Sequence, residues 1–303
     1  MPFLLKEYQN KMKKLLVATC TDWPNLPANV LPMVNLLEEK GIKVTVSPWQ
    51  SSVAADYILP LCTWDYAQTP MAFSEWLADM NKHGCQTVNP VTLMQWNMHK
   101  SYLQEIASWG IDVIPTQVMP QINAEKLREL ALSIYQQTQQ HIVVLKPLIG
   151  QSGQSVQKWD CLSSELPHLE CYQNGLVIQP YIQAIEHYGE TSLIYFNGVF
   201  SHAVKRQPPA GEWRANSAYG VQIHTVVPSQ QALDLATALL DKLPHTPIYA
   251  RVDGTDILAD NRFLLNELEV IEPALYLHTN QLASERFANV LLEMMGVSKN
   301  KNY

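Results

Sequence analysis

The chain has 303 residues, which is enough for two or three modest lobes that each enclose a hydrophobic core. Hydrophobic residues make up 47% and charged residues 16% of it, so the composition excludes an intrinsically disordered protein. The formal net charge of −7 argues against a chain-wide nucleic-acid surface, and we expect no nucleic-acid partner.

Cysteine usage and hydropathy narrow the class further. The 5 cysteines include no C-x-x-C pair, so neither a disulfide framework nor a zinc site is predicted. No stretch approaches the roughly 18 apolar residues of a membrane span, and residues 1–14 contain too short an apolar run for a signal peptide. We therefore expect a cytoplasmic protein without membrane contact, whose first ten or so residues form a loosely ordered arm.

Residues 12–90 show short apolar strands that alternate with helical periodicity. The strands are expected at residues 15–18, 42–46, 57–62 and 86–88. Between them, residues 28–40 and the segment from Phe73 to Met80 place apolar side chains on one helical face. This alternation predicts an α/β domain with an open parallel sheet.

The loops at the carboxyl ends of such strands usually carry the ligands. Here these loops are residues 21–23 and 63–66, and they contain Trp23, Trp64 and Tyr66. Their polar and aromatic content suits a small polar substrate. An alternative is that Trp64 and Tyr66 only pack the junction with the next domain, and the sequence leaves both interpretations open.

A single amphipathic helix is predicted after Asn89-Pro90. Its apolar side carries Leu93, Trp96, Leu103 and Ile106, and its other side carries Lys100. The residue pattern alone favours a solvated helix lysine at this position. Residues 111–115 then lead to another strand, and residues 124–139 form a further amphipathic helix.

Residues 142–155, with the sequence IVVLKPLIGQSGQS, combine a strand, a lysine and a glycine loop. A lysine at the end of a buried strand should face an anion, and the glycines allow backbone N–H groups to converge on phosphate oxygens. This pattern indicates a lid over a nucleoside triphosphate. The alternative is a β-hairpin whose Lys146 extends to water. Neither a Walker A loop nor a dinucleotide fingerprint is present.

The segment from residue 176 to residue 243 contains the strongest turn signal in the chain. Strands at 192–196 and 199–204 are joined by Asn197-Gly198, which predicts a type I′ hairpin. Residues 205–214 are basic and proline-rich, and we expect a flexible loop there. Ser229 is expected to cap the helix that follows.

The densest group of acids lies on two predicted strands near the C-terminus. The strand at 248–252 ends at Asp253, and the next strand carries Glu267 and Glu269, which share one face because they are two residues apart. If the two strands are antiparallel, three carboxylates converge and suit Mg²⁺. The alternative is a solvated acidic strand face. The motifs of serine hydrolases and zinc proteases are both missing.

The order of these parts resembles that of ATP-grasp enzymes, of the bacterial glutathione synthetase type and of the cyclo-ligase type found in cycloserine biosynthesis. The resemblance covers residues 13–295. It is carried by NPVTLMQWNMHKSYL, VVLKPLIGQSGQSV, VIQPYI, GETSLIYF, KRQPPAGEWRAN, ARVDG and NELEVIEPALYL. It implies an ATP-grasp fold of the α/β class, in which two α+β lobes clamp ATP. The implied domains are an N-terminal substrate domain (12–90), a central lobe with the glycine lid (91–180) and a C-terminal lobe with the metal-binding acids (181–303).

The resemblance also implies roles for individual residues. Lys100 and Lys146 should contact the α- and β-phosphates, with Ser152, Gly153 and Gln154 in the lid. Adenine should lie against Gln179, Tyr181 and Ile182, and the ribose should lie against Glu190, with Glu186 as a rival. Asp253, Glu267 and Glu269 should bind Mg²⁺ or Mn²⁺, while Arg251 and Arg214 should face the γ-phosphate and an acyl phosphate. The family pattern commonly ends Glu-x-Asn, so Glu269 leaves the third ligand and the number of metal ions open.

The activity implied is that of an ADP-forming ligase, which joins a small carboxylate to an amine or a similar nucleophile through an acyl phosphate. An ATP-grasp phosphotransferase and a catalytically idle ATP-binding module are the alternatives. The expected partners are small amino-acid-like molecules. A homo-oligomer is an option by analogy, because related enzymes are often dimers or tetramers.

Overall fold

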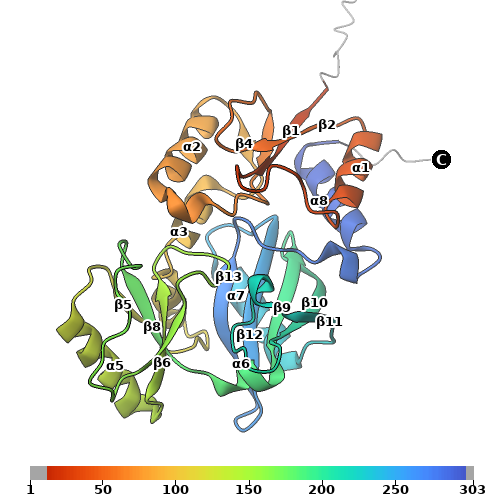
Figure 1. The fold of residues 1–303 in the computed structure, drawn as a ribbon. Coiled ribbons are helices and arrows are strands. Elements are labelled where there is room, and N and C mark those ends of the chain that lie inside the picture. Colours follow the sequence, from red (N-terminus) through yellow and green to blue (C-terminus); the bar gives the residue numbers. More distant parts are fainter. Residues whose placement is uncertain (1–11, 298–303) are drawn as a thin grey trace, which may run out of the picture.

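The computed structural model describes residues 12–297, so the predicted N-terminal arm lies outside the described residues. Three β-sheets, each accompanied by helices, make up the chain (Figure 1). The predicted α/β class with several sheets is confirmed. Among the helices between residues 12 and 297, none combines the length and apolar character that a bilayer crossing needs.

The first sheet is parallel, as predicted. Its strands are β1 (Lys14–Thr19), β2 (Lys43–Pro48), β3 (Tyr57–Leu59) and β4 (Gln86–Thr87), and its helices are α1 (Leu31–Glu39) and α2 (Pro70–Lys82). The strand order is β2-β1-β3-β4. β3 ends at Leu59 and not at Cys62, because Pro60 has no N–H to donate to a neighbouring strand. This sheet holds the loops that carry Trp23 and Trp64.

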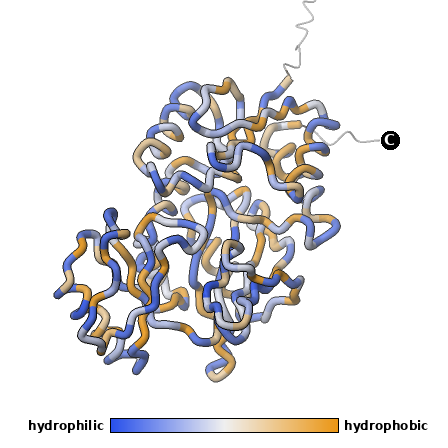
Figure 2. The backbone as a smooth tube through the Cα atoms, viewed as in Figure 1, coloured by the Kyte–Doolittle hydropathy of each residue, from blue (hydrophilic) through white to orange (hydrophobic). Residues whose placement is uncertain are grey.

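The second sheet is antiparallel and contains the glycine loop. Its strands are β5 (Gln117–Met119), β6 (Ile142–Pro147), β7 (Gln157–Asp160) and β8 (Leu176–Pro180), and its helix is α5 (Ala124–Thr138). The order is β5-β8-β6-β7, so the loop joins a hairpin of β6 and β7. Asn123 caps α5 by accepting a hydrogen bond from the N–H of Lys126 at 2.8 Å. Hydrophobic and hydrophilic stretches alternate along α5, as expected for a helix with one packed face (Figure 2).

The third sheet is the largest, and its order is β11-β10-β9-β12-β13. Its strands are β9 (Glu190–Phe196), β10 (Val199–Gln207), β11 (Gln222–Thr225), β12 (Tyr249–Ile257) and β13 (Arg262–Glu269), with helices α6 (Gln183–Tyr188) and α7 (Gln230–Lys242). The predicted hairpin at Asn197-Gly198 is confirmed by φ values of +48° and +74°. The loop predicted at 205–214 is wrong for residues 205–207, because β10 continues to Gln207 and these residues pair with β11.

The single helix predicted after Pro90 is wrong, because the structure contains α3 (Val91–Asn97) and α4 (Tyr102–Ser108) with a break between them. In the break, the N–H of Lys100 donates to the carbonyl of Leu148 at 2.8 Å and so bonds outside its own helix. The first helix contributes to two cores, because Leu93 lies in one core with Leu103 and Ile106. Leu103 and Ile106 pack against the third sheet, whereas Met94 and Met98 pack with the first.

The last described helix, α8 (Ala283–Met294), returns to the start of the chain and packs against α1 (Figure 1). Phe287 and Leu291 are fully buried there, in one core with Leu37. The domain boundaries near residues 90 and 180 fall between the three sheets and remain a proposal, since α8 joins the first sheet from the far end of the sequence.

Candidate active site

A cavity of about 740 Å³ is lined by residues from all three sheets. It contains every predicted site residue except one: Lys100, Lys146, Ser152, Gly153, Gln154, Gln179, Tyr181, Ile182, Glu190, Arg214, Arg251, Glu267 and Glu269. The exception, Asp253, is fully buried behind the cavity wall. The structure therefore brings together residues that are spread over most of the sequence.

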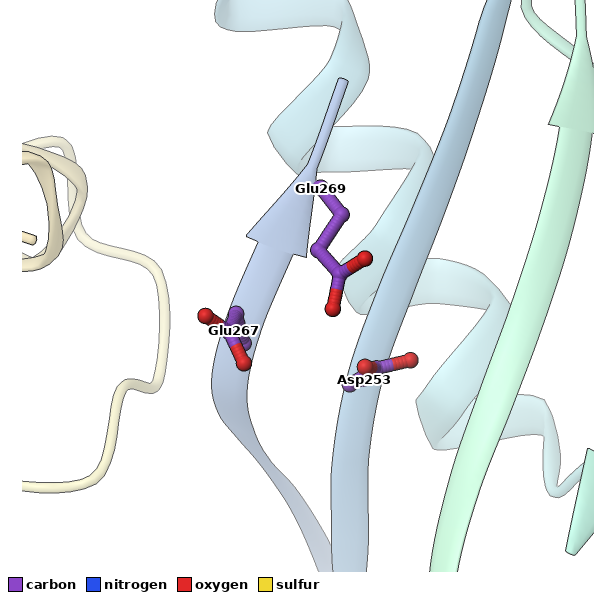
Figure 3. Close-up of side chains that lie close together, drawn as sticks. All are labelled: Asp253, Glu267 and Glu269. Carbon is purple, nitrogen blue, oxygen red and sulfur yellow. The ribbon is translucent and has the colours of Figure 1, made fainter. Parts of the chain in front are cut away.

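Three carboxylates converge on neighbouring strands of the third sheet (Figure 3). β12 and β13 are antiparallel, and Asp253 lies opposite Glu267, with Glu269 two residues further on the same face. One oxygen from each acid lies within 4.8 Å of the other two. This convergence, expected if the strands were antiparallel, supplies three hard oxygen ligands and fits a divalent cation of the Mg²⁺ type.

Basic side chains partly neutralise these acids. Lys100 forms an ion pair with Glu267, and Arg251 forms one with Glu269. Arg251 also donates from Nε and Nη2 to Asp253 at 2.9 and 2.8 Å. Burial raises the pKa of Glu269 to about 7, although Arg251 opposes that change. A metal ion at this position would therefore compete with Lys100 and Arg251 for the same carboxylates.

Lys146 is partly buried and lines the cavity, so it is not a surface lysine that extends away from the site. Its Nζ donates to Asn266 Oδ1 at 2.7 Å. Burial lowers its pKa to about 8, although the negative charge of Glu267 opposes the change. The same residue stands at the end of β6, directly before the glycine loop. β6 and β7 do form a β-hairpin, as the alternative interpretation of residues 142–155 required. A hairpin is compatible with a lid, because the loop between the two strands lines the cavity.

The glycine loop is held over the cavity by the segment that follows β10. The hydroxyl of Tyr219 donates to the carbonyl of Gly153 at 2.9 Å. The guanidinium of Arg214 lies over the Tyr219 ring at 3.6 Å and pairs with Glu212 at 2.7 Å. Gly153 adopts a φ of +71°, which other residues rarely tolerate. The lid therefore contacts the opposite lobe through Gly153 and Tyr219.

The predicted adenine hinge follows β8. Gln179 is buried and donates from Nε2 to Thr116 Oγ1 at 2.9 Å. The hydroxyl of Tyr181 bonds to Glu186, which also pairs with Lys158 at 3.2 Å. Glu186 does not line the cavity, whereas Glu190 does. Of the two rivals for the ribose, Glu190 thus has the more suitable position.

Sequence reasoning missed Arg206, which lies on β10 and is 3% exposed. Its Nη2 donates to Glu190 Oε2 at 2.6 Å and to Asp253 Oδ2 at 2.8 Å. It therefore links the predicted ribose acid to a predicted metal ligand. The signal was present in the sequence, because His202, Val204 and Arg206 continue the period of two that marks one strand face.

The loops of the first sheet close the other end of the cavity. Trp23, Trp64 and Tyr66 line it, as the interpretation of a substrate-binding role requires. Asp65 is turned away and accepts hydrogen bonds from Trp49 Nε1 at 2.6 Å and Gln50 Nε2 at 2.5 Å. Trp64 also packs the junction, since its Nε1 donates to a carbonyl of the third lobe. Both interpretations of these aromatic residues therefore have support.

Comparison with known proteins identifies the class. Residues 110–283 match the family described as prokaryotic glutathione synthetase, ATP-grasp domain, and residues 15–89 match the N-terminal domain of D-cycloserine synthetase DcsG. The chain belongs to this ATP-grasp family. It is an ADP-forming carbon–nitrogen ligase by class.

The similar proteins span almost the whole chain. The cycloserine biosynthesis protein DcsG of Streptomyces lavendulae is 25% identical over 299 residues, which cover 92% of this chain and 99% of that protein. A glutathione synthetase of Prochlorococcus marinus (strain MIT 9313) is 23% identical over 294 residues, which cover 91% and 88%.

Solved structures show the same fold. The crystal structure of D-cycloserine synthetase DcsG has a TM-score of 0.81 at 24% identity and covers 93% of this chain and 99% of that one. D-alanine–D-alanine ligase from Bacillus anthracis has a TM-score of 0.64 at 14% identity and covers 94% and 97%.

Proposed function

We propose that this enzyme uses ATP and Mg²⁺ to join a small, amino-acid-like carboxylate to an amine or a similar nucleophile through an acyl phosphate. The observation that carries the proposal is the convergence of Asp253, Glu267 and Glu269 in contact with Lys100 and Arg251, beside a glycine lid. The names of two relatives point the same way, because cycloserine and glutathione are both amino-acid-derived amides.

The nucleotide would lie between the second and third sheets. Its adenine would contact the hinge at Gln179 to Ile182, and its ribose would contact Glu190. Lys100 and Lys146, which both line the cavity, would face the phosphates under the backbone N–H groups of the lid. Positive charge and oriented N–H groups of this kind stabilise phosphate oxygens in a site from which water is excluded.

The metal site fits Mg²⁺, with Mn²⁺ as a second option, because all three donors are carboxylates. When bound, the ion would neutralise phosphate charge during transfer. Lys100, Arg251 and Arg206 would then release part of their contact with the acids and turn toward the nucleotide. No step requires a protein nucleophile, which agrees with the absence of nucleophile motifs from the sequence.

The chemistry would proceed in two displacements. An oxygen of the substrate carboxylate attacks the γ-phosphorus, the bond to the β-phosphate oxygen breaks, and ADP leaves. The amine nitrogen then attacks the acyl carbon, the bond to the phosphate oxygen breaks, and the nitrogen loses a proton. Arg251 and Arg214 would stabilise the charge that builds on the transferring oxygens, and the closed lid would protect the acyl phosphate from hydrolysis.

ADP formation in the presence of Mg²⁺ tests the proposal, with a panel of amino acids and small carboxylates offered alone and with amines. We expect ADP and phosphate in equal amounts and, by mass spectrometry, a product lighter than its two precursors by one water. A phosphorylated product without a new carbon–nitrogen bond would indicate a phosphotransferase. Tight nucleotide binding without turnover on any pair would contradict the ligase proposal.

A further inference from the structure

Glu272 differs from the other acids that line the cavity. The carboxylates of Glu190, Glu267 and Glu269 each pair with an arginine or a lysine. Glu272 is only 8% exposed, yet among residues 12–297 no arginine or lysine lies within ion-pair distance of it. No other side chain in that range donates a hydrogen bond to its carboxyl group. A buried acid of this kind is unfavourable unless a ligand supplies the missing positive charge.

The backbone of Glu272 is anchored at the cavity wall. Its carbonyl accepts a hydrogen bond from Trp64 Nε1 at 3.1 Å, and Pro273 restricts the chain directly after it. Trp64 comes from the loop after β3, so the first sheet and the third lobe meet at this residue. The position is therefore fixed by two parts of the chain, while the side chain lines the cavity. Within residues 12–297 its carboxyl group forms no ion pair and accepts no side-chain hydrogen bond, and only its own backbone N–H and the more distant charge of Lys100 favour the charged form.

Aromatic residues line the cavity together with Glu272. Trp23, Trp64 and Tyr276, which we call the aromatic subsite, line the same cavity. The rings of Trp23 and Trp64 meet edge to face with centroids 6.1 Å apart. A cavity that combines a carboxylate with aromatic rings is suited to an organic cation, because the ring faces carry negative potential. Arg251, whose guanidinium lies 5.9 Å from the Tyr276 ring, supplies positive charge at the border of this subsite.

We propose that Glu272 binds the ammonium group of an α-amino acid substrate in the aromatic subsite, with the substrate carboxylate directed toward Arg251. This assignment rests on the proposed ligase function and names the substrate class of the same site. Burial, followed by the charge of Glu269, raises the pKa of the free Glu272 carboxyl group well above its usual value. A bound ammonium would supply the ion-pair partner that no side chain among residues 12–297 provides.

Isothermal titration of the full chain, saturated with ADP and Mg²⁺, tests the assignment. The probes are the protein amino acids in both enantiomers, each matched with the 2-hydroxy acid that carries a hydroxyl in place of the ammonium. We expect wild type to bind at least one amino acid tighter than its hydroxy acid. Glu272→Gln should lose that preference by about tenfold or more, as expected for a charged hydrogen bond.

Two control variants, a folding check and a nucleotide-affinity check test whether the effect is specific to the charge of Glu272. Glu272→Asp should retain part of the preference, because it keeps the charge. Glu170→Gln, which removes an exposed acid outside the cavity, should retain all of it. Thermal unfolding checks that each variant is folded, and the affinity for ADP and Mg²⁺ should change by less than about twofold in Glu272→Gln.

The assignment is overturned if Glu272→Gln keeps the preference, or if wild type prefers no amino acid over its hydroxy acid. It is also overturned if the affinity for Mg²⁺ and ADP falls in parallel, because Glu272 would then serve the metal site. ADP formation, measured on the same preparations, separates the two proposals. Turnover without a preference for the ammonium group would support the ligase function and reject the role of Glu272. A preference for the ammonium group without turnover on any substrate pair would support the role of Glu272 and reject the ligase function.

Discussion

Replacing Arg206 with methionine would remove one cation from between two buried carboxylates. The loss falls unequally on them, because Asp253 keeps its hydrogen bonds from Arg251 at 2.8 and 2.9 Å. Glu190 keeps a hydrogen bond from the side-chain amide of Asn266. Among residues 12–297, the variant therefore leaves the buried carboxylate of Glu190 without an ion-pair partner.

Removing one partner of a buried ion pair costs about 3–5 kcal/mol of unfolding free energy. Methionine also removes the Nε–H of Arg206, which has no hydrogen-bond partner within residues 12–297, and this offsets roughly 1 kcal/mol. We expect Arg206→Met to lower the unfolding free energy by about 2–4 kcal/mol at pH 7.5. Arg262→Met is the matched control, because Arg262 and Asp260 pair at 2.9 Å but are about half exposed, so this substitution should lower the unfolding free energy far less.

Urea unfolding followed by circular dichroism measures the unfolding free energy of both variants and of the double variant Arg206→Met/Glu190→Gln. The double variant should regain most of the unfolding free energy that Arg206→Met loses.

Burial raises the pKa of Glu190 in the folded chain, so the folded state prefers the protonated acid and loses stability as the pH rises above about 4.5. Without Arg206 the pKa of Glu190 rises further, so the loss of unfolding free energy caused by Arg206→Met should increase with pH. Equal costs for Arg206→Met and Arg262→Met, or no recovery in the double variant, would refute the reasoning.

Three further outcomes follow from the cavity. Arg214→Ala should abolish turnover while nucleotide affinity, measured by titration calorimetry, stays largely intact; equal loss of both would contradict its role. Burial lowers the pKa of Lys146 to about 8, so this lysine loses its charge above pH 8, and metal-free ADP affinity should fall several-fold between pH 7 and 9. Lys146→Met should abolish that pH dependence. Gly153→Ala places a Cβ 2.7 Å from Asn216 Oδ1 at a φ of +71° and should raise the KM for ATP about tenfold or more. Gly211→Ala, also at positive φ but with no atom within 4 Å, is its control, and similar KM values for the two would argue against lid closure at Gly153.

The features that the sequence predicted best depend on local pattern. Asn197-Gly198 determines a hairpin because both residues tolerate positive φ, and the strand period of two places Glu267 and Glu269 on one face. The antiparallel pairing that adds Asp253 was only a condition at the level of the sequence, and the structure fulfils it. These inferences need no knowledge of distant residues.

The features that the sequence missed depend on distant partners. Lys100 lies in a helix break because its N–H bonds to Leu148 in the glycine loop, and helical periodicity on both sides of the break hides it. Arg206 was assigned to a loop because charge and prolines follow it, although acids on β9 and β12 compensate its burial. Glu272 precedes a proline and carries no pattern of its own, so only the cavity reveals its position.

The return of α8 to the first sheet bears on how such enzymes can be recombined. A chimera that exchanges only residues 12–90 with a related ligase would set α1 of one parent against α8 of the other. The fully buried Phe287 and Leu291 would then face a surface to which they are not matched, at a cost typical of core mispacking. A chimera designed to change substrate preference should therefore have two crossover points, one after the N-terminal domain and one before α8, so that both segments come from the same parent.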